Sequence, residues 1–368
     1  MASDDDILFK TRGPLPEGCR HCHRGGKMVL LITGLCARKC YYCPLSEKKR
    51  GKDVIYANEG QVNGIDGMLA EAEAMRAAGT GITGGDPMCV PDRTLSFIKA
   101  LKTRFGKGHH IHMYTAGDFR TSWISRLEKA GLDEIRFHPP ANSWRRLAGT
   151  RMDLNLRKAI DVGMASGMEL PAIPGMERDL EDVMDILIDS GASFLNLNEL
   201  ELSETNRRAV HSRGIATKGE LSEAALGSEA VAINLLRAHG ARARKAHLTL
   251  HYCSASYKDR VQLRKRMFRR ARNVRRPFEV LTDDATFLKG IIVTKAAGKL
   301  DGIVRTLVRD FEVPHNLLNV DRARSRVEVA PWVLEEIAPS LPMECYIIEE
   351  YPTSDRLEVE RRPLFPRR

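Results

Sequence analysis

Between residue 27 and about residue 255, short apolar runs alternate with segments of helical periodicity. This alternation predicts parallel strands joined by right-handed helical crossovers. Six or seven such units suit a partial (β/α) barrel better than a flat sheet, so we expect functional residues at the carboxyl ends of the strands. The predicted strands are Lys27–Thr33, Gly81–Thr83, His110–Tyr114, Glu134–His138, Met168–Ile173, Phe194–Leu197 and His247–His251.

The pattern changes after Pro277. The elements predicted there are a strand at Phe287–Thr294, a helix at Leu300–Phe311, strands at Leu317–Val320 and Arg326–Ala330, a helix at Trp332–Ala338 and a strand at Met343–Glu350. That β-α-β-β-α-β order is typical of a ferredoxin-like sandwich, an α+β fold. We therefore divide the sequence into an N-terminal extension (1–26), an α/β core (27–255), a basic segment (256–276) and a small C-terminal domain (277–368).

The composition is that of a globular protein. Of the 368 residues, 43% are hydrophobic and 29% are charged, which excludes a mainly disordered or fibrous chain. No apolar run approaches the length of a membrane span, and the first residues are acidic where a signal peptide would be basic. We therefore predict a cytoplasmic protein with no membrane-bound part. The net charge of +10 permits a polyanionic partner without identifying one.

Three cysteines, Cys36, Cys40 and Cys43, follow the first predicted strand on one short loop. A zinc site normally takes four protein ligands, often as paired Cys-x-x-Cys units. Thiolates are also the ligands of iron–sulfur clusters, and three of them on one loop suit a four-iron cluster with one iron left uncovered. We predict that these cysteines bind a [4Fe-4S] cluster.

With Tyr42 directly before its third cysteine, this loop resembles that of the radical S-adenosylmethionine (SAM) superfamily. A second motif of that family, Gly-Gly-x-Pro, is matched by Gly84-Gly85-Asp86-Pro87 after the second strand. Two weaker matches, Tyr114–Gly117 and Ala172–Gly175, resemble strand-end segments of the activating enzymes of glycyl-radical enzymes such as pyruvate formate-lyase. The resemblance covers about residues 27–200 and is nearest to that activating-enzyme group.

The resemblance implies a specific chemistry and a set of binding residues. The open iron would chelate SAM, and an electron from a flavodoxin- or ferredoxin-type donor would release a 5′-deoxyadenosyl radical that abstracts a substrate hydrogen. Gly84, Gly85 and Asp86 are expected at the methionine end of SAM. Thr115, Arg136 and His138 are expected to contact ribose, carboxylate or substrate. We see no cobalamin-binding domain before the core in this sequence, so we do not expect cobalamin-dependent alkylation.

Cys19 and Cys22 form a second tight cluster with neighbouring histidines, which favours metal binding by zinc or an iron–sulfur cluster. Further ligands must come from elsewhere, and Cys253 at the end of a predicted strand is a candidate. The alternative is that the three cysteines are free thiols. Cys345 lies in an apolar strand and is expected in the core of the C-terminal domain.

The segment from Lys258 to Arg276 carries ten lysines and arginines and one acid, with an apolar stripe at helical spacing. Such a cationic helix either binds the phosphates of a nucleic acid or docks on an acidic surface of the protein itself. We take RNA as the first substrate hypothesis, with protein activation or modification as the alternative. A non-catalytic RNA-binding protein with iron–sulfur or zinc is the third. Asn196, Asn198 and Glu199 are expected to line the barrel.

Overall fold

We describe a computed structural model of the chain, covering residues 9–219, 222–294 and 299–364. Residues 1–8 of the predicted N-terminal extension lie outside this description. The chain forms two compact units, one made of Met1–Glu73 with Ala77–Leu263 and the other of Ala74–Arg76 with Arg264–Arg368. The division between them falls inside the predicted basic segment. No helix among the described residues is both long and apolar enough to cross a membrane.

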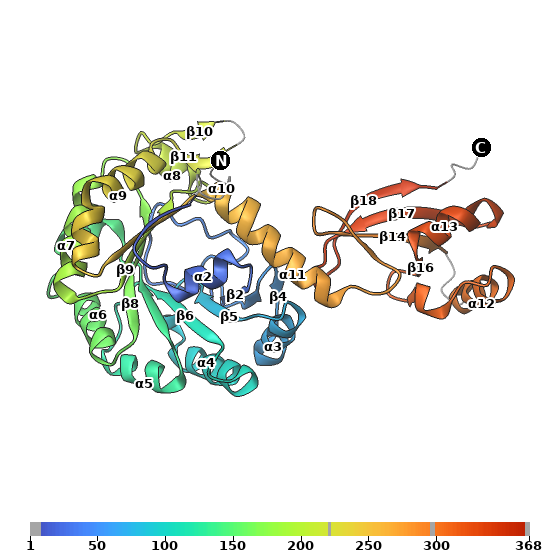
Figure 1. Cartoon of the computed structure of the whole chain (residues 1–368), viewed down its shortest axis with the longest axis horizontal. Coiled ribbons are helices and arrows are strands. Elements are labelled where there is room, and N and C mark those ends of the chain that lie inside the picture. Colours follow the sequence, from blue (N-terminus) through green and yellow to red (C-terminus); the bar gives the residue numbers. More distant parts are fainter. Residues whose placement is uncertain (1–8, 220–221, 295–298, 365–368) are drawn as a thin grey trace. The chain divides into compact units, whose positions relative to one another are not determined.

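The first unit is built on the parallel strands that the sequence predicts, adjacent in the order β12-β9-β8-β7-β6-β5-β2. They curve into the partial barrel seen in Figure 1. Antiparallel strands extend both edges of this sheet, with β1 (Phe9–Arg12) on β12 and the pair β3 (Tyr56–Ala57) and β4 (Gly60–Gln61) beyond β2. The parallel strands are β2 (Lys27–Leu31), β5 (Gly79–Thr83), β6 (His110–Thr115), β7 (Glu134–Phe137), β8 (Ala165–Ala172), β9 (Phe194–Glu199) and β12 (Thr249–Cys253).

Helices surround the outside of this barrel (Figure 1). Their apolar residues recur at helical spacing, as in α7, where Leu180, Val183, Met184 and Leu187 are buried. Each helix therefore covers the sheet with its apolar face. The outer helices are α3 (Gly64–Ala74), α4 (Pro91–Phe105), α5 (Ser122–Ala130), α6 (Arg151–Asp161), α7 (Glu177–Ser190) and α9 (Ser228–Lys245). Between β9 and α9 lie α8 (Arg207–His211), β10 (Thr217–Gly219) and β11 (Ser222–Ala225).

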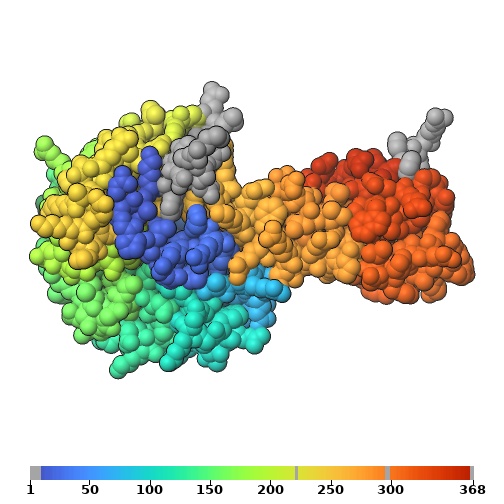
Figure 2. Space-filling view, in the orientation of Figure 1, coloured from blue at the N-terminus to red at the C-terminus, as the bar shows by residue number. Residues whose placement is uncertain are grey.

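A short N-terminal helix, α2 (Glu17–His23), lies on the inner side of the sheet against β2, β5 and β6. Gly18 allows this approach, since a Cβ there would stand 2.6 Å from both Arg136 Nη2 and His112 Nδ1. Its backbone N–H donates to Glu134 Oε2 at 3.2 Å. The space-filling view shows the blue N-terminal part of the chain over the middle of this face (Figure 2). The N-terminal segment thus occupies part of the barrel interior.

The segment after β12 differs from the single amphipathic helix predicted over Lys258–Arg276. It begins with one turn, α10 (Ala255–Tyr257), continues as a π-helix, η3 (Lys258–Leu263), and becomes regular only in α11 (Arg264–Val274). π-Helical turns are rare in proteins, and those that occur often lie at functional sites. Of the apolar stripe, Leu263 ends the π-helix, whereas Met267, Ala271 and Val274 lie in α11.

The second unit has the predicted β-α-β-β-α-β order. Its sheet runs β15-β16-β14-β17-β18, with neighbours antiparallel, and the first four strands have the arrangement of a ferredoxin-like sandwich. Ile292, Leu307, Leu334 and Cys345 belong to the core between sheet and helices, which confirms the expectation for Cys345. The elements are β13 (Val280–Leu281), β14 (Phe287–Val293), α12 (Leu300–Asp310), β15 (Leu318–Asp321), β16 (Arg326–Val329), α13 (Pro331–Ile337), β17 (Glu344–Glu350) and β18 (Glu358–Pro363).

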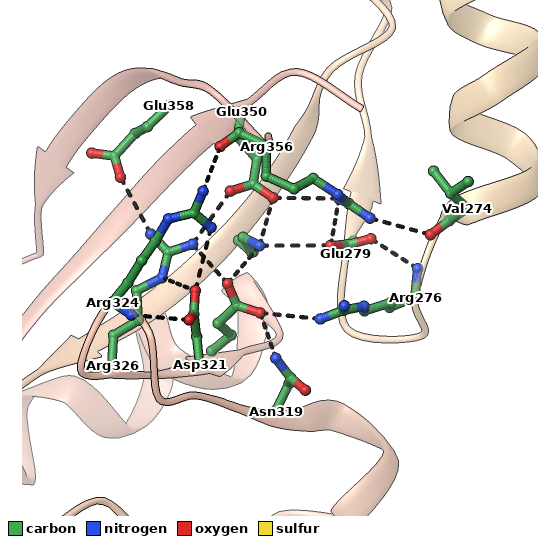
Figure 3. Close-up of polar contacts among 12 residues, drawn as sticks. Val274, Arg276, Glu279, Asn319, Asp321, Arg324, Arg326, Glu350, Arg356 and Glu358 are labelled. Carbon is green, nitrogen blue, oxygen red and sulfur yellow. Dashed lines mark hydrogen bonds and ion pairs between the residues drawn. The ribbon is translucent and has the colours of Figure 1, made fainter. Parts of the chain in front are cut away.

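The opposite face of this sheet carries a network of buried charges. Lys289 Nζ lies 2.7 Å from a carboxylate oxygen of Glu328 and 2.7 Å from one of Glu350, and 3.6 Å from Glu279. Arg326 contacts Glu328 and Glu350 from the other side (Figure 3). Each of these five side chains is at most 3% exposed. Each of these buried side chains therefore has partners of the opposite sign, which offset the cost of burying its charge.

Candidate active site

The cysteine loop leaves the carboxyl end of β2, where the sequence predicts the cluster. Cys36 is exposed, Cys40 and Cys43 are half-buried, and all three are free thiols. Burial raises the pKa of Cys36 to about 11, so metal binding has to displace its proton. A set of three accessible thiols on one loop fits the ligands that a four-iron cluster requires.

Buried anchors hold this loop in place. The Tyr42 side chain is 4% exposed, and its hydroxyl accepts a hydrogen bond from the Ala141 N–H at 3.2 Å. The Asn206 amide donates to the Tyr42 carbonyl at 2.9 Å, and the Thr205 hydroxyl donates to the Leu45 carbonyl at 3.1 Å. The aromatic residue of the motif therefore serves as the loop's internal anchor. The thiols on either side of it are left available.

The Gly84-Gly85 turn lies directly against the cysteine loop. Gly85 N–H donates to the Thr33 carbonyl and Asp86 N–H to the Leu35 carbonyl, each at 2.8 Å. A Cβ at Gly85 would stand 2.2 Å from the Leu35 oxygen, and one at Gly84 would stand 2.3 Å from the Thr33 oxygen. Both glycines are needed because two backbone segments meet there without room for a side chain. The structure thus joins the two motifs into one site.

Asp86 and Thr115 are bonded to each other and to neighbouring backbone. Asp86 Oδ1 accepts from the Thr115 hydroxyl and from the Met88 N–H, each at 2.9 Å, and Oδ2 accepts from the Ala116 N–H at 3.1 Å. The Thr115 hydroxyl also accepts from the Gly117 N–H at 3.1 Å. Burial raises the pKa of Asp86. These contacts fasten the Gly-Gly turn to the end of β6.

Arg136 and His138 both point into the barrel, as their alternation along β7 predicts. Arg136 is 2% exposed and forms ion pairs with Glu134 and Glu169, while its Nη2 has no hydrogen-bond partner among the described residues. His138 directly follows β7, two residues after Arg136. Its ring centroid lies 6.0 Å from that of Tyr42. Burial lowers the pKa of His138, which favours the neutral imidazole. Of the two, His138 is the one placed beside the cysteine loop.

The acidic partner Glu169 was missed from the sequence. Its carboxylate accepts hydrogen bonds from the Asn196 amide at 3.1 Å and the Asn198 amide at 2.8 Å. Burial alone would raise the pKa of Glu169, but Arg136 and the two amides outweigh it and lower the pKa to about 2. Glu199 faces elsewhere and accepts from the Ala255 N–H. The available signal was the alternation of polar residues along β7, β8 and β9.

Cys19, Cys22 and Cys253 also lie in the first unit, on α2 and at the end of β12. Burial raises the pKa of Cys19 and of Cys253 to about 12. Within the described ranges, no three His, Cys, Asp or Glu side chains already converge as a metal ion would require. Neither cysteine set therefore forms a ready-made site for a single metal ion among the described residues.

An open groove of about 980 Å³ lies beside the cysteine loop. Its wall includes the segment whose Thr205 and Asn206 hold that loop. The lining is charged with both signs and includes Glu204, Arg207, Arg208, His211 and Glu223.

Several cations of the basic segment bind the protein itself. The Arg269 guanidinium donates to the carbonyls of Met75 and Arg76 at 2.6 to 3.0 Å, and Arg264 donates to the Asp283 carbonyl at 2.6 Å. Lys258 pairs with Glu201 at 2.5 Å. These three of the segment's ten cations thus have partners within the protein.

The comparisons with known proteins agree with this site. The model of the radical SAM superfamily matches residues 30–187, and that of a domain of unknown function, DUF8061, matches residues 285–364. The chain is also 37% identical to MJ0021 of Methanocaldococcus jannaschii, which is named provisionally as a glycyl-radical enzyme activating enzyme. That alignment covers 379 positions, 99% of this chain and 96% of the relative.

Two solved structures are more distant. SuiB of Streptococcus suis, bound to S-adenosylmethionine, gives a TM-score of 0.46 at 14% identity, over 62% of this chain and 50% of SuiB. The match therefore spans only half of the SuiB chain. The protein anSMEcpe, bound to AdoMet and a Cp18Cys peptide, gives 0.39 at 12% identity, over 60% of this chain and 62% of its own. At these scores neither likeness bears on function.

Proposed function

Because this chain belongs to the radical SAM superfamily, we propose that it abstracts a hydrogen atom from a protein substrate, as an activating enzyme for a glycyl-radical enzyme does. The observation that carries the proposal is the similarity to an activating-enzyme relative over 99% of the chain. The family implies a [4Fe-4S] cluster and SAM, and the joined cysteine and Gly-Gly motifs fit both. The cytoplasmic location and the flavodoxin- or ferredoxin-type electron donor belong to the same proposal.

Each motif has a distinct part in the proposed site. Cys36, Cys40 and Cys43 hold the cluster, and the Gly84-Gly85 turn binds the methionine end of SAM through its backbone. Together, the bound cluster and SAM supply the one-electron chemistry that removes the substrate hydrogen. The protein contributes position and the exclusion of water.

The chain's own residues keep this site ordered and dry. Met28, Leu30 and Ile32 are fully buried and form the apolar strand beneath the cysteine loop. Tyr42 and His138 close the loop's inner side. His138 is neutral at physiological pH, so it can hold one proton and accept at its other ring nitrogen without adding charge beside the cofactors.

Protein is favoured over RNA as the substrate by the basic segment, because Arg264, Arg269 and Lys258 already bind the protein. The groove beside the cysteine loop carries charges of both signs, which suits a polypeptide better than a phosphate backbone. RNA remains the alternative outcome of the test below.

The first test measures the chemistry of the site. Reduced anaerobic protein with SAM should form 5′-deoxyadenosine. Changing Cys40 to Ala should abolish this product, because it removes one of three thiolate ligands. The matched control is Cys345→Ala, which removes a thiol from the core of the second unit and should leave the product unchanged. Product formation by the Cys40 variant would show that the loop does not hold the cluster.

The second test separates the substrate classes. Substrate turnover should raise 5′-deoxyadenosine formation above its unstimulated level when extract of the source cells is added. We expect protease treatment of that extract to remove the stimulation and ribonuclease treatment to leave it. Loss after ribonuclease alone would replace the protein proposal with RNA.

A further inference from the structure

A second set of thiols, on elements other than the cysteine loop, gathers inside the first unit. Cys19 and Cys22 are one helical turn apart on α2, so they face the same side of that helix. Cys253 is the last residue of β12. Helix α2 contacts η3, the π-helical segment that follows β12 shortly after Cys253. The fold therefore brings together cysteines that are more than two hundred positions apart in the sequence.

Amide side chains link these thiols. Gln262, on η3, accepts from Cys22 Sγ through its Oε1 at 2.7 Å and donates through its Nε2 to Cys253 Sγ at 3.4 Å. One amide group thus separates the two sulfurs. The Asn196 amide nitrogen lies 3.5 Å from Cys19 Sγ, and Asn196 is 1% exposed. Its Oδ1 has no hydrogen-bond partner among the described residues, which is unusual for a buried oxygen.

A cation stands near each thiol. Burial lowers the pKa of Lys27, but the Cys22 sulfur and other nearby groups outweigh burial and raise it, and no ion pair of Lys27 occurs within the described ranges. Arg136 interacts with Cys19, and Lys258 with Cys253. Glu134, Glu169 and Glu201 already pair with the latter two cations. Lys27 is therefore left to compensate a further negative charge at the thiols.

We propose that Cys19, Cys22 and Cys253 are the thiolate ligands of a second iron–sulfur cluster inside the barrel. Three thiolates and a [4Fe-4S] core of charge about +2 carry a net charge of about −1, which the unpaired Lys27 balances. Zinc normally takes four protein ligands, whereas three thiolates can hold a four-iron cluster with one iron left open. Soft thiolate ligands and a charge-balanced interior both suit the cluster.

Binding requires one local change. The Gln262 amide must rotate out from between Cys22 and Cys253 so that both sulfurs can reach iron. Gln262 lies in the π-helix rather than in a regular helix, so its backbone is held in a less stable arrangement that permits such a change. The Asn196 amide remains as a hydrogen-bond donor to the ligand sulfur of Cys19.

The experiment counts iron and sulfide in the full chain reconstituted anaerobically. We expect about eight irons per chain, against about four for the cysteine loop alone. The variant Cys36→Ser/Cys40→Ser/Cys43→Ser should keep about four irons and show the electron paramagnetic resonance signal of one reduced cluster. This count needs neither SAM nor substrate, so its failure is distinct from a failure of the proposed function.

The matching variant Cys19→Ser/Cys22→Ser/Cys253→Ser should also keep about four irons, now in the cysteine loop. Cys345→Ser is the control and should retain the full count, since its thiol lies in the second unit. Far-ultraviolet circular dichroism checks that each variant folds. If the triple serine variant does not fold, Cys22→Ser alone replaces it, because that thiol is only half-buried.

Two results would overturn the proposal. The first is a count of about four irons in the wild-type chain and none in the cysteine-loop variant. The second is a chain that binds zinc in addition to the iron of the cysteine loop and loses that zinc when Cys19, Cys22 and Cys253 are changed.

Discussion

At the scale of single residues, the predicted site residues also bond to other groups of the protein. Asp86 and Thr115, both predicted to contact cofactor or substrate, also hydrogen-bond to each other and to neighbouring backbone. Arg136 was expected to contact a carboxylate, and the carboxylates it meets belong to Glu134 and Glu169. The type of residue was readable from the sequence, but the partner was not, because partners come from other strands.

The residue-scale prediction concerns Asp86→Asn. In Asp86, Oδ2 accepts a hydrogen bond from the Ala116 N–H. In the variant an amide NH₂ group takes the place of one carboxylate oxygen, so one buried N–H donor loses its acceptor. We expect the free energy of unfolding to fall by about 1–3 kcal/mol, measured by urea denaturation of the anaerobic protein. SAM affinity should weaken as a consequence of the loosened Gly-Gly turn. Thr115→Val, which removes the partner hydroxyl, should shift both quantities in the same direction. Unchanged stability with lost SAM affinity would instead make Asp86 a direct ligand.

At the scale of elements, the sequence predicted what depends on local pattern. The parallel strands and the β-α-β-β-α-β order formed as expected because their apolar residues recur with a clear period. Helix α2 was not predicted: it has only seven residues, and its stability comes from the barrel around it. The π-helix η3 was not predicted either, because a regular apolar stripe at Leu263, Met267 and Ala271 gives no sign of it. The meeting of Cys19, Cys22 and Cys253 depends on both elements.

Gly18→Ala tests how tightly α2 fits into the barrel. Alanine favours a helix over glycine by about 1 kcal/mol, so an exposed site would be stabilised. Here the added methyl would stand 2.6 Å from Arg136 Nη2 and His112 Nδ1, both fully buried, and overpacking costs about 1–3 kcal/mol. We expect a net loss of stability by thermal unfolding. The control is Gly302→Ala in α12, where the nearest atom is the Arg305 side chain at 3.9 Å, and a gain of up to about 1 kcal/mol is expected. Stabilisation by both changes would show that α2 is loosely held.

At the scale of the whole molecule, the two units differ in the kinds of side chain that they bury. The first unit encloses polar residues and thiols where the proposed chemistry takes place. The second has an apolar core on one face of its sheet and buried charges on the other. Arg356 adds to those charges by contacting Glu279 and Glu350, and it also donates to the Val274 carbonyl at the end of α11 (Figure 3). The network thus ties the basic helix to the sheet of its own unit, which makes that helix part of a folded structure.

Lys289→Met measures what this network contributes. The change leaves Glu328 and Glu350 buried without the cation that each contacts at 2.7 Å, and losing one partner of a buried pair costs about 3–5 kcal/mol. Lys289 contributes to the lowered pKa of Glu328 although burial opposes it, so in the variant that pKa should rise above its unfolded value. A raised folded pKa gives stability at low pH that is lost as pH rises, so the deficit should be smaller at pH 5 than at pH 8. Urea denaturation at both values checks this, with Arg322→Met at the exposed Arg322–Asp301 pair as a control that should change by about 1 kcal/mol or less. A deficit that is independent of pH would mean that packing, not charge, is what Lys289 supplies.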